Sequence, residues 1–317
     1  MEAIVSREQD GTGTALGVRE GQAAVAEAWL DQLDVCEKSR ATYRRALRNF
    51  TAWLEDAGLD VAHTNRADVM AYKRHLHDHY SAYTESAYLT AVRGLYAWLD
   101  AQGIYPNVAA GIRGAKKSGR AAKDALTVEQ ARDLMAGEAT TPAELRDRAM
   151  INLMLRRGLR TIEVVRADVG DLRQLGGKAV LYVQGKGHDA KDDYVVLGAE
   201  VLQPISDYLA TRRDLGEHSP LFAATGNRNG GGRMTTRSVS RIVREAYRDH
   251  GIVNPRITAH SLRHTAVTFA LMGGATVQEA QGMARHGNIS TTMIYAHNLE
   301  RTAARAESSV DAILDGA

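Results

Sequence analysis

The chain has 317 residues, long enough for two domains, and its 44% hydrophobic and 25% charged content is typical of a globular protein. No apolar run approaches the roughly 20 residues that span a bilayer, and the N-terminus lacks the basic start and apolar stretch of a secretory signal. The single cysteine, Cys36, excludes an internal disulfide and a cysteine-based metal cluster, so we expect a cytoplasmic protein in which this side chain is partly buried.

The first part of the chain is expected to be helical. Residues 1–20 are aperiodic and rich in glycine and threonine, which indicates a flexible tail. Residues 21–110 carry four apolar stripes at helical spacing and predict a small bundle of helices. Residues 111–124 have no periodicity and are rich in glycine, alanine and basic side chains, so we expect an extended linker between two domains.

Local signals predict where the helices of this bundle begin and end. Ser39 is expected to cap the second helix, because a serine hydroxyl can accept a hydrogen bond from the first unpaired amides. Gly58 is expected to end that helix. Asn65 together with Asp68 predicts a cap in front of the third helix.

The second domain is expected over residues 125–317 and is predicted to be mostly helical. Capping boxes that begin at Thr127, Thr141 and Thr276 each predict the start of a helix. Gly158 is expected to end the helix that follows Thr141, because glycine tolerates the left-handed conformation found after many helices.

Two strands and three further helices complete this domain. Residues 178–184 and 193–197 are rich in β-branched and aromatic side chains and predict two strands joined by a turn. Helices are expected at about 200–212, 235–249 and 260–272. The predicted fold class is therefore mainly α with one small β-sheet.

The basic residues are clustered, although the net charge is only +2. One cluster lies at 38–48 and another at 112–123. Each is either a solvated surface or a region that contacts nucleic-acid phosphates. The candidates for such contacts are Arg40, Arg44, Arg45, Arg48, Arg113, Lys116, Lys117, Arg120 and Lys123.

The most informative stretches lie near the C-terminus: T-A-H-S-L-R-H-T at 258–265 and M-A-R-H-G-N-I-S-T-T-M-I-Y-A-H at 283–297. Upstream lie G-L-R-T-I-E at 158–163 and G-K-G at 185–187. Together they supply the groups that can attack a phosphodiester without a metal. A tyrosine hydroxyl is the nucleophile, guanidiniums hold the phosphate oxygens, and an ammonium protonates the leaving oxygen.

The order Arg…Lys…His-x-x-Arg…His…Tyr resembles the tyrosine recombinase family, which includes phage integrases and Xer-like proteins. The resemblance covers about residues 20–317 and is strongest over 140–300. It implies an N-terminal helical DNA-binding bundle and a mixed α+β catalytic domain, which together close on DNA as a C-shaped clamp. It also implies site-specific cleavage and rejoining of duplex DNA through a 3′-phosphotyrosyl intermediate, without metal, cofactor or ATP.

The resemblance further implies double-stranded recombination sites as partners, a monomer in solution and a homotetramer in the synaptic complex. Accessory DNA-bending proteins are a further partner class, and the biological role is integration or excision of a mobile element, or resolution of DNA. Two alternatives stay open at this point. One is DNA relaxation of the type IB topoisomerase kind, and the other is a non-catalytic DNA-binding relative.

Six residues form the expected catalytic set: Arg160, Lys186, His260, Arg263, His286 and Tyr295. Tyr295 is the expected nucleophile, in a helix that Ser290 could start. Arg160 and Arg263 are expected to clamp the phosphate. Lys186, on a turn between two glycines, is expected to protonate the 5′ bridging oxygen. Lys191, further along the same turn, is a weaker candidate for that role.

Three histidines are given different roles. His260 is expected to exchange a proton with Tyr295, since an imidazole with a pKa near 6.5 populates both forms at cellular pH. His286 is expected to hydrogen-bond a phosphate oxygen, and His264 to be structural. His260 and His264 stand four residues apart, but Ser261 occupies the position where a zinc protease has glutamate, so no metal site is expected.

One supporting residue and two departures from the family pattern remain. The first departure is Arg157, where the family often has a small polar residue. Glu163 could hold Arg160, order His260, or be an exposed carboxylate in the first turn of a helix. Arg285 stands where the family usually has a small residue, often glycine. It could crowd the site around His286 or add a phosphate contact.

The last residues predict a short C-terminal helix. Ser308 or Ser309 can cap it, and Val310, Ile313 and Leu314 fall on one face. So short a helix must dock this apolar side somewhere. It either folds back on its own domain or, as the resemblance implies, inserts into a neighbouring protomer.

Overall fold

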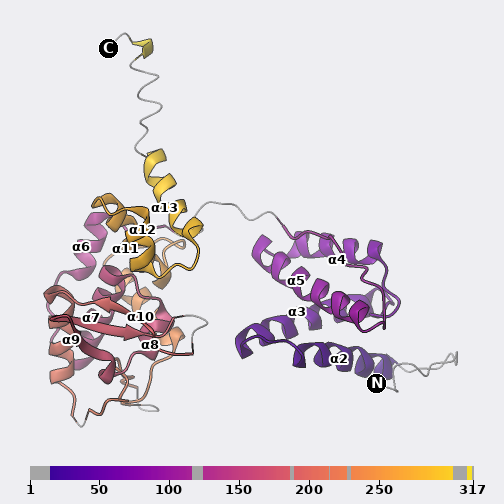
Figure 1. Ribbon diagram of the computed structural model, residues 1–317, viewed down its shortest axis with the longest axis horizontal. Coiled ribbons are helices and arrows are strands. Elements are labelled where there is room, and N and C mark those ends of the chain that lie inside the picture. Colours follow the sequence, from indigo (N-terminus) through magenta and orange to yellow (C-terminus); the bar gives the residue numbers. More distant parts are fainter. Residues whose placement is uncertain are drawn as a thin grey trace. The chain divides into compact units, whose positions relative to one another are not determined.

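The computed structural model describes residues 15–115, 124–185, 189–213, 215–226, 230–302 and 313–315 (Figure 1). The chain divides into two compact units, Met1–Ser118 and Gly119–Ala317. No helix in these described ranges is long and apolar enough to cross a membrane.

The first unit is the expected small bundle of helices, drawn in indigo to purple in Figure 1. Its helices are α2 (Ala15–Asp31), α3 (Glu37–Asp56), α4 (Arg66–His79) and α5 (Ala82–Ala101). Helix α3 packs against α2 and α5, and α4 packs against α5. Phe50, Tyr72 and Tyr96 are fully buried at its centre, with ring centroids 4.8 Å and 6.1 Å from that of Phe50. Burial of these apolar faces is what stabilises the short helices.

Three expected boundaries are corrected by the structure. Helix α2 begins at Ala15, inside the segment predicted to be a tail. Helix α3 is preceded by Cys36 and not by Ser39, whose amide already donates a hydrogen bond to the Cys36 carbonyl within the first turn. Cys36 itself is exposed, although it was expected to be partly buried. Near the C-terminus, the Asn288 side chain accepts a hydrogen bond from the Ser290 amide, so Ser290 does not start that helix.

The other capping signals are confirmed. Asn65, Thr127, Thr141 and Thr276 each accept a hydrogen bond from the helix they precede, and each forms the reciprocal bond of a capping box. Gly158 ends its helix in the left-handed conformation, with φ 63° and ψ 30°. These short-range hydrogen bonds depend on neighbouring residues only, which is why sequence patterns detect them.

The second unit is mainly helical with one small sheet, as expected. It begins with α6 (Val128–Met135), α7 (Pro142–Arg157), α8 (Thr161–Arg166) and the short 3-10 helix η1 (Val169–Asp171). The sheet follows with β1 (Leu172–Leu175), β2 (Lys178–Val183) and β3 (Asp193–Val196). The rest is α9 (Ala199–Ala210), α10 (Thr236–Asp249), α11 (Ala259–Met272), α12 (Val277–Ala284) and α13 (Ile289–Thr302). Helix α7 lies at the centre and packs against α9 and α11, while α11, α12 and α13 pack on one another (Figure 1).

The sheet has three antiparallel strands in the order β1-β2-β3. Strands β2 and β3 match the predicted pair, whereas β1 was not predicted. Its sequence, Leu-Arg-Gln-Leu, is short and largely exposed, so it lacks the apolar alternation of a half-buried strand. The signal that could have revealed it is the pair Gly176-Gly177, whose φ angles of 56° and 74° form the tight turn to β2.

Close packing in the first unit leads to a stability prediction. A Cβ added at Gly94 of α5 would lie 2.4 Å from Cζ2 of Trp29 in α2. Overpacking a core costs about 1–3 kcal/mol, which exceeds the gain of about 1 kcal/mol from removing a helical glycine. We therefore expect Gly94→Ala to lower the midpoint of thermal unfolding. Gly21→Ala, where nothing lies within 4 Å, is the matched control and should leave the midpoint unchanged or raised; equal shifts in both variants would contradict the packing.

Candidate active site

A tight corner between α7 and α8 positions Arg160. Gly158 ends α7, and Arg160 stands immediately before α8. The Glu163 carboxylate accepts the Arg160 amide at 2.7 Å through Oε2 and the Arg160 Nη1 at 2.6 Å through Oε1. Glu163 is fully buried, so it is neither an exposed carboxylate nor free to move. Of the three interpretations of Glu163, the structure supports the one in which it holds Arg160.

Arg263 of α11 is buried among helix ends. Its Nη1 donates to the Gly158 carbonyl at 2.6 Å, and its Nη2 donates to the Ala284 carbonyl. These carbonyls lie at the C-termini of α7 and α12, where helix dipoles favour a positive charge. Burial, together with the charge of Arg160, lowers the pKa of Arg263 to about 9, so the guanidinium stays protonated at neutral pH.

Arg285 occupies a position whose backbone conformation suits glycine. It follows α12 in the left-handed conformation, with φ 52° and ψ 50°, which glycine adopts without steric cost. Its guanidinium turns inward, and Nη2 lies 2.7 Å from Glu163 Oε2, with only 6% of the side chain exposed. Its carbonyl accepts Arg160 Nη2 at 3.0 Å. Arg285 is thus ion-paired inside the protein and is not an exposed phosphate contact.

The two arginines control the charge of Glu163. Burial by itself would raise the pKa of this carboxyl group, but the charges of Arg285 and Arg160 and their hydrogen bonds outweigh it. The pKa of Glu163 is therefore lowered, and the residue is an anion held between two cations.

Tyr295 of α13 lies against two histidines. It is only 7% exposed, and its hydroxyl is hydrogen-bonded to Nδ1 of His264. The ring centroids of His264 and His286 lie 5.2 Å and 6.4 Å from that of Tyr295. Burial raises the pKa of Tyr295 to about 12, although the charge of Arg263 opposes this shift. His264 was expected to be structural, but it contacts the Tyr295 hydroxyl. The sequence signal for this place is its position next to Arg263 and one helical turn after His260.

His286 is held beside this tyrosine by Thr292. Its Nδ1 lies 2.9 Å from the Thr292 hydroxyl, and Thr292 is fully buried in α13. Burial, followed by the charges of Arg263 and Arg160, lowers the pKa of His286 to about 4. The imidazole is therefore neutral in the free protein at neutral pH.

His260 lies at the exposed edge of the cluster, in the first turn of α11. Its ring meets that of His264 edge to face, with centroids 4.6 Å apart. It also lines a cavity of about 210 Å³ together with Thr161, Ser240 and Arg244. Arg244 was not predicted to lie near the site. The signal that could have indicated it is the row of basic residues along the polar side of α10. Within the described part of the chain, no group of three His, Cys, Asp or Glu side chains could hold a metal.

The two lysine candidates differ in what the structure describes. Lys186 lies outside the described residues. The Lys191 ammonium lies 2.7 Å from Asp168 Oδ2 and 2.5 Å from Asp171 Oδ2, so it forms two ion pairs at the edge of the sheet. Lys191 is therefore already paired within its own domain.

The basic candidates for DNA contacts fall into three groups. Arg44 forms a bidentate ion pair with Glu27, and Arg40 donates to the Leu33 carbonyl, so both have partners within the first unit. Three are exposed: Arg45, Arg48 and Arg113. Four lie outside the described residues: Lys116, Lys117, Arg120 and Lys123.

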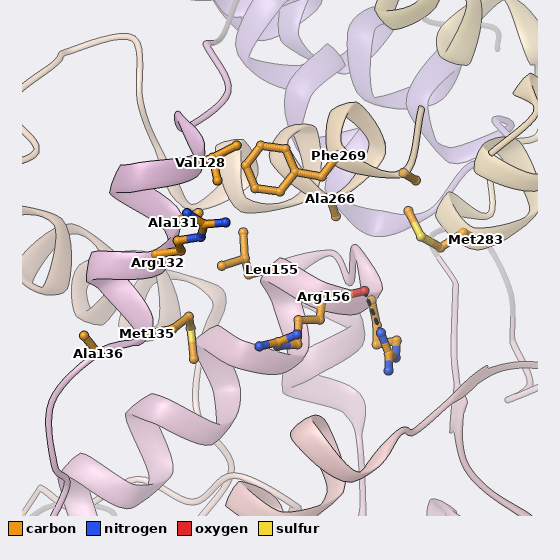
Figure 2. Close-up of a pocket in the computed structure, with 12 residues that line it drawn as sticks. Val128, Ala131, Arg132, Met135, Ala136, Leu155, Arg156, Ala266, Phe269 and Met283 are labelled. Carbon is orange, nitrogen blue, oxygen red and sulfur yellow. Dashed lines mark hydrogen bonds between the residues drawn. The ribbon is translucent and has the colours of Figure 1, made fainter. Parts of the chain in front are cut away.

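A separate apolar pocket of about 700 Å³ lies between α6, α7 and α11 (Figure 2). Leu155 and Phe269 face each other across it, and Met283 of α12 lies at one side. Arg132, Arg156 and Arg157 contribute the charged side chains. The pocket shares α11 and α12 with the Tyr295 cluster, but its lining includes none of the candidate catalytic residues.

Comparison with known proteins identifies the family. The phage integrase family model matches residues 124–301, and the N-terminal SAM-like domain model of phage integrases matches residues 27–103. The chain is 31% identical over 289 residues to the tyrosine recombinase XerD of Mycobacterium tuberculosis, covering 85% of this chain and 91% of that protein. The tyrosine recombinase XerD of Corynebacterium glutamicum is 29% identical over 289 residues, covering 86% and 93%.

Solved structures have the same fold. A XerH site-specific recombinase bound to palindromic difH substrate matches with a TM-score of 0.71 at 21% identity, covering 84% of this chain and 80% of that one. A lambda integrase tetramer bound to a Holliday junction matches with a TM-score of 0.68 at 16% identity, covering 90% and 78%. The chain belongs to the phage integrase family, and it is a site-specific recombinase that cleaves and rejoins DNA strands.

The unusual environment of His286 can be measured directly. We expect its imidazole to titrate at about 4 in the free protein, below the ordinary 6.5. Because the folded-state pKa is lowered, the stability contributed by this site is complete above pH 6.5 and is lost as the pH falls toward 4. NMR of labelled imidazole rings, with His286→Gln to assign the signal, measures the midpoint. A midpoint near 6.5 would contradict the burial of this ring.

Proposed function

We propose that Tyr295 is the nucleophile of this recombinase. Its oxygen attacks the scissile phosphorus, forms a 3′-phosphotyrosyl bond and displaces a 5′-hydroxyl, and a 5′-hydroxyl of the partner strand reverses the step. The observation that supports this is the hydrogen bond of the Tyr295 hydroxyl to His264, together with the His286 ring stacked 6.4 Å from the tyrosine ring and the charge of Arg263, which acts on the hydroxyl. The bond energy is retained in the phosphotyrosine, so the reaction requires neither ATP nor a metal.

Arg160 and Arg263 are assigned to the phosphate. The Arg160 side chain is 23% exposed and is anchored by Glu163, so it can meet a phosphate oxygen at the surface of the unit. Arg263 is 1% exposed, and its charge acts on the phosphate at short range within a region of low dielectric. The neutral His286 would gain charge when an anionic phosphate binds, since the anion stabilises the imidazolium.

The tyrosine must lose a proton, because a phenol with a pKa of about 12 is almost entirely protonated at neutral pH. His264 holds the hydroxyl in the free chain, and the exposed His260 lies one turn before it on α11. We assign proton exchange to His260, at the edge that DNA can reach. Lys186 is assigned the protonation of the leaving 5′ oxygen, on the basis of the family resemblance alone.

The partners are proposed to be double-stranded recombination sites in the cytoplasm. The solved relatives include a XerH recombinase on its difH substrate and a lambda integrase tetramer on a Holliday junction. By analogy, four copies of this chain would assemble on two sites and exchange two pairs of strands. The free protein is proposed to be a monomer, and accessory DNA-bending proteins are proposed as further partners. Relaxation of the type IB topoisomerase kind and a non-catalytic role are not favoured, since the relatives are recombinases. Integration or excision of an element and resolution of DNA are both consistent with this chemistry.

The C-terminal tail is proposed to link neighbouring copies. Ile313 and Leu314 are 81% and 77% exposed, so in the described chain they do not pack on their own domain. Ser308, Ser309 and Val310 lie outside the described residues. The apolar pocket between α6, α7 and α11 offers a surface of matching chemistry on a second copy (Figure 2).

The nucleophile is tested by Tyr295→Phe on a nicked suicide substrate. We expect complete loss of the covalent DNA adduct and nearly unchanged duplex affinity, because binding depends on many phosphate contacts in both units. The assay is run in EDTA without ATP, and wild-type protein should form the adduct under these conditions. Persistence of an SDS-resistant adduct in the variant would falsify the assignment. In a separate assay on supercoiled plasmid, release of supercoils without strand exchange by the wild type would indicate a topoisomerase instead.

The role of the tail is tested by deleting residues 307–317 and, separately, by Leu314→Asp. We expect both variants to fold and bind a single site, while pairing of two sites and strand exchange are impaired. Val253→Asp, at an equally exposed apolar residue 87% accessible, is the matched control and should pair sites normally. Circular dichroism, gel shift and a synapsis assay separate the steps. Unimpaired synapsis would exclude the exchanged tail, whereas loss of folding would favour docking on its own domain.

A further inference from the structure

Arg285 has a backbone conformation that does not suit its side chain. Among the described residues it is the one non-glycine residue with a positive φ, 52°. Glycine would adopt this conformation without strain, so the backbone alone gives no reason for an arginine here. The side chain supplies the reason, because its guanidinium is buried and makes contacts that a glycine could not.

These contacts connect Arg285 to Arg160 in two ways. Its Nη2 pairs with Glu163 Oε2 at 2.7 Å, while Glu163 Oε1 pairs with Arg160 Nη1 at 2.6 Å. Its carbonyl accepts Arg160 Nη2 at 3.0 Å. A further bond from Arg285 Nη1 to the Met283 carbonyl, 2.8 Å long, fixes its own guanidinium. Two nitrogens of the Arg160 guanidinium are therefore held by the Arg285–Glu163 pair.

The charges around Glu163 give this arrangement an electrostatic consequence. With Arg285 present, the buried carboxylate has two cationic partners, Arg160 and Arg285. Without it, Arg160 would be the one ion-pair partner left to Glu163, and the positive charge of Arg160 would be largely neutralised toward a bound phosphate. A buried anion with one partner removed is also strongly disfavoured.

We propose that Arg285 is a positioning residue for strand cleavage: it orients Glu163 and balances its charge, so that the Arg160 guanidinium is both fixed and available to the scissile phosphate. Arg285 acts through these two residues, since its own side chain is too buried to touch DNA. This role rests on the proposed function of Arg160 in phosphate binding.

The test compares single-turnover cleavage of a nicked suicide substrate with DNA affinity. For Arg285→Gly we expect a cleavage rate lower by about tenfold to a hundredfold, the range found when outer partners of metal ligands are removed. Duplex affinity should change by less than about twofold, because most contacts to the phosphate backbone lie elsewhere. Arg285→Lys keeps a charge but loses the planar fork, and should cleave at an intermediate rate.

A double variant separates charge balance from simple bracing. In Arg285→Gly/Glu163→Gln the unbalanced carboxylate is removed, so cleavage should be faster than in Arg285→Gly alone. If Arg285 only held Glu163 in place mechanically, the cleavage rate would not recover, because the double variant lacks both ionic partners of the Arg285–Glu163 contact. Thermal unfolding of each variant is recorded, and Arg285→Lys carries the comparison if Arg285→Gly unfolds.

Three outcomes would overturn the proposal. The first is a wild-type cleavage rate in both Arg285→Gly and Arg285→Lys. The second is a double variant no faster than Arg285→Gly. The third is a wild-type protein that forms no adduct at all, which would reject the proposed function itself and would be recognised because it affects the unmodified chain.

Discussion

The site depends on one buried carboxylate. Glu163 is completely enclosed and ionised, and such a group is stable inside a protein only when cations and hydrogen-bond donors surround it. Arg160 and Arg285 provide these from two directions, the first from the start of α8 and the second from the end of α12. The same ion pairs that stabilise Glu163 therefore bring together two segments separated by more than a hundred residues.

Arg263 makes a second connection of the same kind. Its guanidinium binds the carbonyls of Gly158 and Ala284, which lie at the ends of α7 and α12, where helix carbonyls have no partner within the helix. A group assigned to phosphate chemistry thus also satisfies backbone acceptors in the free protein. A cluster of guanidiniums repels itself, and the negative ends of two helices together with Glu163 offset this repulsion in the free protein. This arrangement fits the proposed role of these arginines in binding a phosphate.

Tyr295, in contrast, is held in an unreactive form in the free protein. Its hydroxyl is buried and hydrogen-bonded to His264, and its pKa of about 12 means that the hydroxyl is protonated at neutral pH. As the proposed nucleophile, a protonated Tyr295 is too weakly nucleophilic to attack a phosphodiester that is not bound at the site. Release from His264 and approach to a phosphate held by the arginines would then couple reactivity to substrate binding, which suits an enzyme that breaks DNA strands.

The sequence by itself determined the helical periodicity, the capping boxes at Asn65, Thr127, Thr141 and Thr276, and the family motif, because each depends on residues close together in the chain. Only the tertiary structure decided what surrounds the motif. The inward turn of Arg285 onto Glu163 and the contact of His264 with Tyr295 join residues from different parts of the chain. The contact of Arg160 with Glu163 is local, but only the structure showed which of the possible partners Glu163 holds. Strand β1 was missed for a related reason, since its exposed polar residues are held by pairing with β2 and not by their own pattern. Local rules cannot choose among such contacts, because desolvation and charge balance depend on every group that packing brings within reach.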